Sequence, residues 1–532
     1  MNTNYFALTI GPIYATFAQA KKTRAVWAAS YFFSWFIKQV LTKTKKDGFE
    51  IILPYHDDIK KSKFGSGMYA DRIYFTENEK GTVKKLQEII DVIIADLTVD
   101  ISLNTIHKDK KTVEKFLKSY LNLHIVGTEL DSNKLGVRST SVLERLNQLL
   151  DNKELETNYS FEYDDNPLMN YLELESGIHT LLVKDAFDDP NKRRFRSLPE
   201  IASSSLDRLN KPEYKKLVDL SFKGTKGKQK QEYELLDELK KSSAFKDYFR
   251  PYHKYFGVLY ADGDNISDLL KAVAQDKNDL LKFSGKLMEF AMLAEQSIID
   301  YGGNGIYLGG EDILAFIPLA CKQKKSEELQ TIFHLVNELD AHFKNTLGKY
   351  AEEKKVKIPT LSYGIMLSYA KHPLKESMHI AHNLLLKSKK IAGKNTIGLR
   401  FQKHSGQIIE CFIEKNEAKS RSWLKIQEYT TNYTKYAVKE KQNDILSSIM
   451  HRFKDDLFYS TFTEAAAANR LVAFFENFFD EKIHKDEKNI FLKDVRELSE
   501  IILSDYGCKI PNSRDILFTV LRLVHFINSE KE

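Results

Sequence analysis

Cysteine is scarce in this chain: three residues, Cys321, Cys411 and Cys508, lie far apart among 532. A zinc knuckle needs closely spaced pairs of cysteine or histidine ligands, so we expect none, and so few cysteines suit a reducing compartment. The apolar stretch from Val26 to Phe36 falls well short of the roughly 18 residues that a membrane span requires. We therefore expect a cytoplasmic protein without a membrane partner.

Neither sign of charge dominates, because 80 basic and 74 acidic residues leave a net charge of +6. This is a weak preference for anionic partners, and it lacks the dense positive charge of a dedicated nucleic-acid-binding domain. Charge therefore permits RNA binding and does not establish it.

The length of the chain predicts three or four domains, at about 150 residues per domain.

Strand and helix patterns divide the chain into four regions. Residues 1–184 begin with a strand, a Gly-Pro turn and one or two helices within residues 5–41. Strands at FEIILP and ADRIYFTE and helices at 81–95 and 110–122 follow, which predicts an α+β domain. Residues 185–250 form a connecting region with a flexible lysine-rich loop at 223–230. Residues 406–532 show amphipathic helical patterns without strand runs, which predicts a C-terminal helical bundle. The connecting region also carries a basic cluster, made of Lys192, Arg193, Arg194 and Arg196.

Residues 251–405 carry the clearest pattern. FGVLYA is an almost unbroken apolar strand, two helices follow it, and the hairpin IYL-GGED-ILAFIPL comes next. The pattern continues with a helix near 325–348, the strand LSYGIMLSYA, a helix at 374–392 and the strand TIGLRF. The resulting β-α-α-β-β-α-β-α-β order predicts a ferredoxin-like sheet with helices on one face, the arrangement of the polymerase/cyclase palm.

Carboxylates occur at two points of this predicted palm. YADGDN supplies Asp262 and Asp264, and GGED supplies Glu311 and Asp312. The first strand of such a sheet ends beside the turn of the central hairpin, so we expect Asp262 to face Glu311 and Asp312. Hard oxygen ligands of this kind suit Mg²⁺, and nucleotidyl transfer uses two divalent ions. Each motif alone is an ordinary turn, but the two together in this strand order favour catalysis.

Glycines and lysines near these carboxylates fit a phosphate site. The hairpin glycines allow a tight turn and keep side chains away from phosphates, and Gly263 leaves room for a backbone carbonyl to approach a metal. Backbone N–H groups after Asp264 begin a helix and can cradle a triphosphate. The two lysines can reach polyphosphate, although lysines near a helix end also occur because they offset the helix dipole. The residues expected at the nucleotide are Gly263, Asp264, Asn265, Ile266, Gly309, Gly310, Lys389 and Lys394.

One protein family shares these motifs. The segments of the predicted active palm that carry the resemblance are YADGDNISDLL, YLGGEDILAF and YAKHPLKESMHIAHNLLLKSKKIAGKN. They resemble the GGDEF-type cyclase palm and, more closely, the large subunit of type III CRISPR effector complexes. Three further segments are similar to that subunit, especially in its III-B form: IGPIYATFAQAKKTRAVWAASYFFSWF, YADRIYF and RFRSLPEIA. The resemblance covers roughly residues 5–405.

The resemblance implies two ferredoxin-like palms in one chain, the second of them GGDEF-like. Gly11-Pro12 stands in the first palm where the active palm has aspartates, so we expect an inactive lobe that completes the ATP sites. The implied cofactors are two Mg²⁺ or Mn²⁺ ions with ATP as substrate, and the implied partners are other complex subunits, crRNA and target RNA. The implied metal ligands are Asp262, Gly263, Glu311 and Asp312, and the three acidic residues among them are catalytic.

Two departures from the family pattern matter. The usual tetrad is Gly-Gly-Asp-Asp, whereas Glu311 stands third here; glutamate also binds Mg²⁺, so we expect retained activity. Many members begin with an HD nuclease domain, but the palm-like segment starts near residue 5, so we expect no such domain and no DNase activity. The lone His56-Asp57 pair has no supporting set of metal ligands.

The function that the resemblance implies is a target-RNA-activated nucleotidyltransferase that makes an adenylate signal, usually cyclic oligoadenylate, from ATP. Three alternatives stay open. The same site could join AMP to S-adenosylmethionine, the chain could be a free-standing cyclase making a cyclic dinucleotide as a homodimer, or it could be a structural subunit with a decayed site. The fused inactive palm argues against the free-standing cyclase, and three carboxylates with two lysines in register argue against decay. The sequence does not decide the acceptor.

Overall fold

The computed structural model describes most of the chain. Some features singled out in the sequence lie outside the described residues. They are the His56-Asp57 pair, the lysine-rich loop at 223–230 and the basic residues 192–194 of the connecting region. The described residues are 2–20, 22–47, 49–54, 62, 64–77, 83–131, 142–155, 166–174, 180–187, 195–222, 234–274, 276–323, 328–415, 421–435, 467–477, 485–506 and 512–529.

The N-terminal sheet has four antiparallel strands in the order β2-β3-β1-β4. Helices α1 and α2 connect β1 to β2, and α3 and α4 connect β3 to β4. The predicted N-terminal strand, the strands at FEIILP and ADRIYFTE and the predicted helices are present, whereas β4 was not anticipated. The bounds are β1 (Asn2–Gly11), α1 (Ile13–Gln19), α2 (Thr23–Lys46), β2 (Phe49–Leu53), β3 (Arg72–Glu77), α3 (Val83–Asn104), α4 (Lys110–Tyr120) and β4 (Asn122–Asp131).

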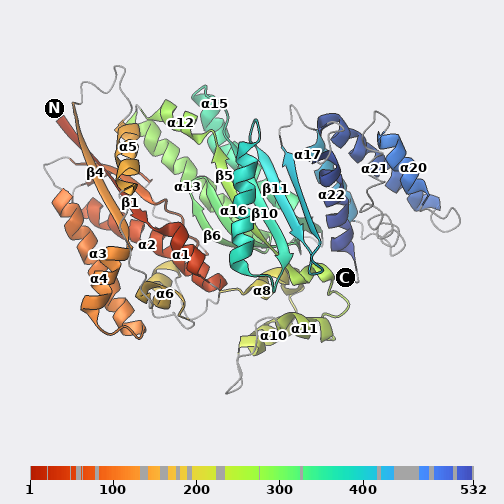
Figure 1. Ribbon diagram of the computed structural model, residues 1–532, viewed down its shortest axis with the longest axis horizontal. Helices are drawn as coiled ribbons and strands as arrows, with labels where there is room; N and C mark the ends of the chain where they lie inside the picture. Colours follow the sequence, from red (N-terminus) through yellow and green to blue (C-terminus); the bar gives the residue numbers. More distant parts are fainter. Residues whose placement is uncertain are drawn as a thin grey trace.

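Short helices join this part to the second sheet. Among them, α8 packs on β5 and β7, and α10 and α11 lie below the second sheet in Figure 1. The described part of the connecting region is therefore mostly helical. The bounds are α5 (Val142–Glu154), α6 (Pro167–Leu172), α7 (Leu181–Ala186), α8 (Leu198–Ala202), α9 (Ser204–Asp207), α10 (Pro212–Phe222) and α11 (Glu234–Lys241).

The second sheet has six strands in the order β12-β11-β10-β5-β7-β6. Its part β10-β5-β7-β6 is antiparallel and repeats the strand order of the N-terminal sheet, which is the ferredoxin-like order. The predicted hairpin and strands are confirmed here. The bounds are β5 (Tyr255–Asp264), α12 (Ile266–Val273), α13 (Lys277–Asp300), β6 (Asn304–Gly309), β7 (Asp312–Pro318), β8 (Ala320–Lys322), β9 (Leu329–Thr331), α14 (Ile332–Phe343), α15 (Lys349–Glu353), β10 (Thr360–Tyr369), α16 (Leu374–Lys390), β11 (Thr396–Gln402) and β12 (Ile408–Glu414).

Helices cover both faces of the second sheet, so the prediction of helices on one face is wrong. Leu259 and Ala261 of β5 pack into a core that includes α13 and α14. Val258, on the other face of the same strand, packs into a second core with Met378 of α16 and the N-terminal helices. The physical reason is β11, which runs parallel to β10 and therefore needs a crossover, and α16 is that crossover (Figure 1).

The strand β12 corrects the expected start of the helical region at residue 406. Buried and less buried positions alternate along IIECFIE, and the buried positions Ile409, Cys411 and Ile413 face the core. Phe526 of α22 then packs edge-on against Tyr255 at 4.8 Å between ring centroids. The following helices are α17 (Ser422–Lys435), α20 (Ala467–Glu476), α21 (Lys485–Tyr506) and α22 (Asn512–Asn528).

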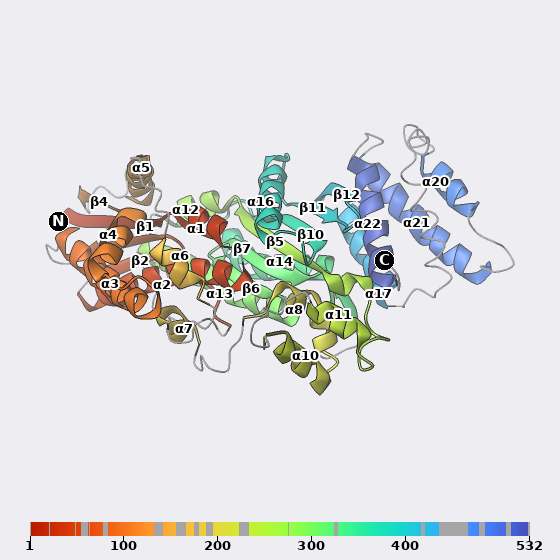
Figure 2. The same ribbon diagram turned by 60° about the horizontal axis from the view of Figure 1, so that its bottom comes forward.

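The described parts form a row, with the N-terminal sheet at one end, the six-stranded sheet in the middle and the last helices at the other end (Figures 1 and 2). The first two parts are joined by backbone pairing, because Gly67 bridges to Tyr307 on the edge strand β6. No helix in the described ranges is long and apolar enough to cross a membrane.

Candidate active site

The end of β5 meets the start of β7. These strands are antiparallel, and Ala261 pairs with Ile313, so the next position along each strand sets Asp262 beside Asp312. Gly309 pairs with Asp312, which closes the hairpin over two residues. Gly310 takes a φ of 71°, a left-handed value that glycine adopts without steric cost.

Gly263 lies directly against the hairpin turn. A Cβ atom on Gly263 would stand 2.8 Å from the Cβ of Glu311 and 2.7 Å from Cγ1 of Ile266. Any larger residue would therefore push the turn away from β5. The structure thus brings the YADGDN and GGED motifs into contact.

Lys389 in the last turn of α16 reaches the same point. Its Nζ forms an ion pair with Asp262 and donates a hydrogen bond to the carbonyl oxygen of Gly263 at 3.2 Å. Lys394 lies on the loop after α16 with a φ of 56°, and no ion pair joins it to these carboxylates. The structure therefore gathers one of the two predicted lysines at the carboxylates.

The carboxylates of the hairpin turn are difficult to ionise. Burial raises the pKa of Glu311, repulsion from Asp262 adds to the shift, and Lys389 opposes it. The Asp312 residue is partly open to solvent. The protein packed around its carboxyl group nevertheless raises its pKa well above the usual range, and the charges of Glu311 and Asp262 raise it further. A cation placed among these groups would relieve the repulsion.

The donor set can be compared with what a metal needs. The three acidic side chains offer only hard oxygen atoms, which suits Mg²⁺ or Mn²⁺ in kind. Among the described residues, however, no group of three or more His, Cys, Asp or Glu side chains is close enough together to hold an ion. In this arrangement Asp262 is paired with Lys389 instead of being gathered with Glu311 and Asp312.

Asp264 lies apart from the other carboxylates, although it was predicted near the nucleotide. Its side chain is fully buried, and its Oδ2 accepts hydrogen bonds from the Ser362 hydroxyl at 2.7 Å and the Thr360 hydroxyl at 3.1 Å. The backbone N–H of Asn395 donates to the same oxygen at 2.9 Å. The other oxygen, Oδ1, is buried and makes no hydrogen bond with the described residues.

The predicted phosphate turn follows at once. Asn265 has a φ of 62°, a left-handed conformation that Asn tolerates better than most residues. Ile266 is buried and begins α12, so the first N–H groups of that helix lie next to Gly263. The predicted residues from 263 to 266 therefore form one tight strand-to-helix turn.

Two further residues near the turn were missed in the sequence. Tyr307 of β6 lies against Gly309, and burial followed by the charges of Asp312, Asp71 and Glu311 raises its pKa. Asp71 comes from the N-terminal part, and its charge also raises the pKa of Asp312. The motif YADRIYF contained this aspartate, but its strand pattern gave no sign that it lies near the second sheet.

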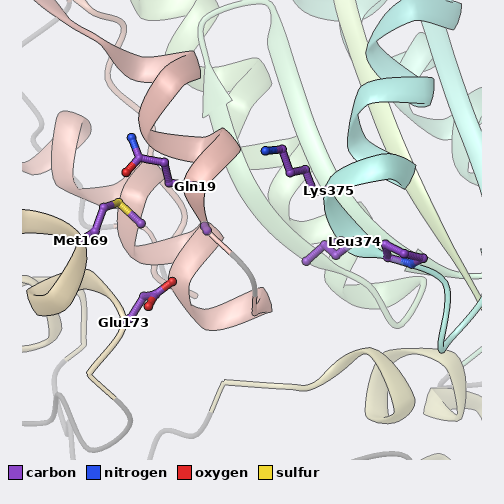
Figure 3. Close-up of a pocket in the computed structure, with 7 residues that line it drawn as sticks. Gln19, Met169, Glu173, Leu374 and Lys375 are labelled. Carbon is purple, nitrogen blue, oxygen red and sulfur yellow. The ribbon is translucent and has the colours of Figure 1, made fainter. Parts of the chain in front are cut away.

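A cavity lies elsewhere in the described part of the chain. It measures about 570 Å³ between the end of α1, α6 and the start of α16, and Figure 3 shows Gln19 and Lys375 on its walls. Lys375 and Lys389 stand near opposite ends of α16, about 21 Å apart along its axis at 1.5 Å per residue. The cavity is therefore separate from the carboxylates.

The second sheet has known relatives. Residues 255–398 match the family model described as Cas10/Cmr2, second palm domain. The six-stranded sheet is therefore similar to that palm domain. Over 190 residues the chain is 25% identical to the protein named CRISPR system Cmr subunit Cmr2 from Pyrococcus furiosus, a match that covers 31% of this chain and 20% of that protein. The chain thus matches about a fifth of the length of this curated relative.

Two solved structures share the fold of this chain. One is a type III-B Cmr-beta structure in the apo state, with a TM-score of 0.52 and 12% identity, covering 90% of this chain and 77% of that one. The other is type III-B Cmr-beta bound to cognate target RNA, with a TM-score of 0.51 and 11% identity, covering 98% and 83%. At these identities the likeness shows the fold alone.

Proposed function

We propose that this chain is the large subunit of a type III CRISPR effector complex. In that complex it acts as a Mg²⁺-dependent nucleotidyltransferase that converts ATP into cyclic oligoadenylate when target RNA binds. One observation carries the proposal: Asp262 stands beside Asp312 on adjacent strands, with Glu311 in the turn, inside the segment that matches the Cas10/Cmr2 second palm.

The reaction is the transfer of an AMP unit. The 3′-hydroxyl of one nucleotide attacks the α-phosphate of ATP, a new phosphorus–oxygen bond forms, the bond to the β-phosphate bridge breaks, and pyrophosphate leaves while the hydroxyl proton passes to solvent. Asp262, Glu311 and Asp312, with the Gly263 carbonyl, would hold two Mg²⁺ or Mn²⁺ ions, which supply charge neutralisation at the hydroxyl and at pyrophosphate.

The remaining site residues bind and position ATP. Lys389 already reaches the end of β5, so its ammonium group can contact a polyphosphate bound there. The N–H groups that begin α12 point along the same turn and favour anionic oxygens. Lys394 on the neighbouring loop adds positive charge without a fixed ion pair to the carboxylates.

The rest of the chain supports this site in the proposal. The N-terminal sheet repeats the ferredoxin-like strand order, and we assign residues 1–184 as an inactive palm that faces the active one. Residues 185–250 connect the two, and residues after the last strand form the C-terminal helical domain. Other complex subunits, crRNA and target RNA are the partners, and a matched Cmr-beta structure is one bound to cognate target RNA.

The test is a product assay on the assembled complex. Complex with its guide is mixed with matching target RNA, Mg²⁺ and labelled ATP, with and without S-adenosylmethionine, and products are identified by mass spectrometry. Cyclic adenylates from ATP alone, lost in Asp312→Asn, are the expected result. The matched control is Asp91→Asn, which changes an exposed aspartate of α3 that pairs with Lys118.

Two other results would replace the proposal. The first is an adduct that appears only with S-adenosylmethionine, which would make the chain an AMP-conjugating synthase. This alternative stays open because Glu311 departs from the usual tetrad. No product under any condition, from a complex that assembles and binds target RNA, would make it a structural subunit.

A further inference from the structure

Asp264 ties together three segments that are distant in the sequence. It ends β5, and its Oδ2 accepts one hydrogen bond from each of Thr360 and Ser362 on β10 and one from the backbone of Asn395. Each of these donors points at the same buried oxygen. A charged oxygen that accepts three donors makes stronger bonds than a neutral one would.

The third segment is the loop that follows α16. Three successive residues, Gly393, Lys394 and Asn395, take positive φ values of 97°, 56° and 50°. Side chains other than glycine adopt such values at a cost, so the conformation needs support from outside the loop. Lys389 lies one turn earlier on α16, and the loop therefore sets where that helix ends.

Lys415 supports the loop from the opposite side. Its backbone N–H donates to the carbonyl oxygen of Asn395 at 2.9 Å, so Asn395 is held on both its N–H and its C=O groups. The Lys415 side chain is almost fully buried, and its Nζ contacts Oδ1 and Oδ2 of Asp340 at 2.7 and 2.5 Å. The Tyr363 hydroxyl donates to Asp340 at 2.9 Å and completes the group.

We propose that Asp264 and Lys415 are positioning residues that fasten the 391–395 loop to the end of β5 and thereby place Lys389 and Lys394 at the phosphate site. Asp264 acts through Asn395 instead of contacting nucleotide. Lys415 lies beyond residues 255–398, the segment that matches the family model. The link to ATP rests on the proposed function, whereas the fastening of the loop does not.

The fastening is tested by hydrogen exchange on the free, full-length chain. In Asp264→Asn and in Lys415→Met, the backbone amides of residues 391–396 should exchange about tenfold faster or more. The first substitution weakens the bonds to Asp264, and the second removes the Asp340 pair that fixes the backbone of Lys415 beside Asn395. Lys354→Met is the matched control, since it removes another lysine that pairs with an aspartate, Asp279. Ser362→Ala is a milder change that removes one donor to Asp264 and should shift exchange of residues 391–395 in the same direction. The Thr396 amide is left out of this comparison, because it donates to the Ser362 hydroxyl at 3.4 Å.

The consequence for ATP is tested on the assembled complex. Asp264→Asn should raise the KM for ATP about tenfold while leaving the pH profile of kcat unchanged, because the lysines lose their placement and the carboxylates keep theirs. Unchanged exchange in Asp264→Asn and Ser362→Ala would overturn the inference. Faster exchange with an unchanged KM would overturn its link to ATP.

Failure of the proposed function gives a different pattern. A wild-type complex without any product would remove the nucleotidyltransferase assignment, yet the exchange experiment would still decide whether Asp264 and Lys415 hold the loop.

Discussion

Asp262 and Asp312 stand beside each other at the ends of two adjacent antiparallel strands, one position beyond the pair formed by Ala261 and Ile313. Lys389 pairs with the first of them, and Glu311 adjoins the second. Three acidic side chains and one lysine therefore meet where β5 ends and β7 begins. Burial and the excess of acidic groups raise the pKa values of Glu311 and Asp312, and both effects decide how the site responds to substitution and to pH.

Removing one of these charges should stop the proposed reaction. In Asp312→Asn the side chain keeps its size but loses the charge that a divalent ion needs, so product formation should fall at least about 100-fold. The rate is measured with assembled complex, target RNA and labelled ATP. Asp91→Asn should retain wild-type rate, and equal rates in the two variants would contradict the assignment of Asp312.

The raised pKa values predict how stability changes with pH. Glu311 and Asp312 hold protons more tightly in the folded chain than in the unfolded chain, so folding binds protons. By linkage, the stability of the fold falls as pH rises from the ordinary carboxyl range through the raised pKa values. The measurement is the thermal midpoint between pH 4 and pH 8, taken in EDTA and in excess Mg²⁺.

Mg²⁺ should reverse this loss at the upper end of the range, because a bound cation lowers the cost of ionising both groups. Asp312→Asn should flatten the pH dependence and reduce the gain from Mg²⁺, whereas Asp91→Asn should preserve both. If Mg²⁺ gave the same shift in all three proteins, its binding site would lie elsewhere.

Much of the site could be predicted from the sequence because its residues sit on regular elements. The apolar run before Asp262 marked a buried strand, and Gly309-Gly310 marked a hairpin turn, so the meeting of the two motifs followed from strand order alone. Lys389 followed from its place at the end of a helix. Local sequence patterns were sufficient where the strand order brings the ends of two strands together.

Other features depended on contacts that no local pattern records. Asp264 looks like a ligand in YADGDN, yet the hydroxyls of Thr360 and Ser362 face it across the strand and turn it into an anchor. Asp71 directly precedes β3 of the N-terminal sheet, so its charge near Asp312 arises only from domain packing. The strand β12 has apolar residues on both faces, and the helical patterns that follow it obscured the boundary.

Close backbone packing between α16 and β10 predicts a site where a methyl group is not tolerated. A Cβ on Gly364 would lie 2.9 Å from the Cα of Leu385 and would also collide with the carbonyl oxygen of Ala381. Gly364→Ala should therefore reduce the free energy of unfolding by about 2 kcal/mol or more. Gly348 is the matched control, since its φ is −62° and its nearest neighbour is 3.4 Å away.

Gly348→Ala should be neutral or stabilising by up to about 1 kcal/mol. Gly348 is helical in the folded chain, and alanine at this position lowers the conformational entropy of the unfolded chain. Urea unfolding of the two variants, followed by circular dichroism, separates the outcomes. A Gly364→Ala protein as stable as Gly348→Ala would show that α16 can move away from β10.

Glu295 of α13 holds the segment that joins the two sheets. Its side chain is 3% exposed, and it accepts a hydrogen bond from the Ser62 hydroxyl and one from the backbone N–H of Ser66 at 3.3 Å. The same segment then pairs with β6, where the N–H of Leu308 donates to the carbonyl oxygen of Gly67 at 2.7 Å. Glu295 therefore fixes the edge of the strand that leads into the hairpin turn.

Glu295→Ala should release this segment, because two buried donors lose a charged acceptor at a cost of about 2 kcal/mol. Hydrogen exchange of the amides at residues 306–308 should accelerate, and the thermal midpoint should fall. Glu289→Ala provides the comparison on the same helix, since Glu289 is half exposed and pairs only with Lys286 among the ion pairs described, a contact worth at most about 0.5 kcal/mol. Equal exchange in the two variants would mean that β6 keeps its position without the contacts of Glu295, and the backbone pairing at Gly67 would then suffice to hold the two sheets together.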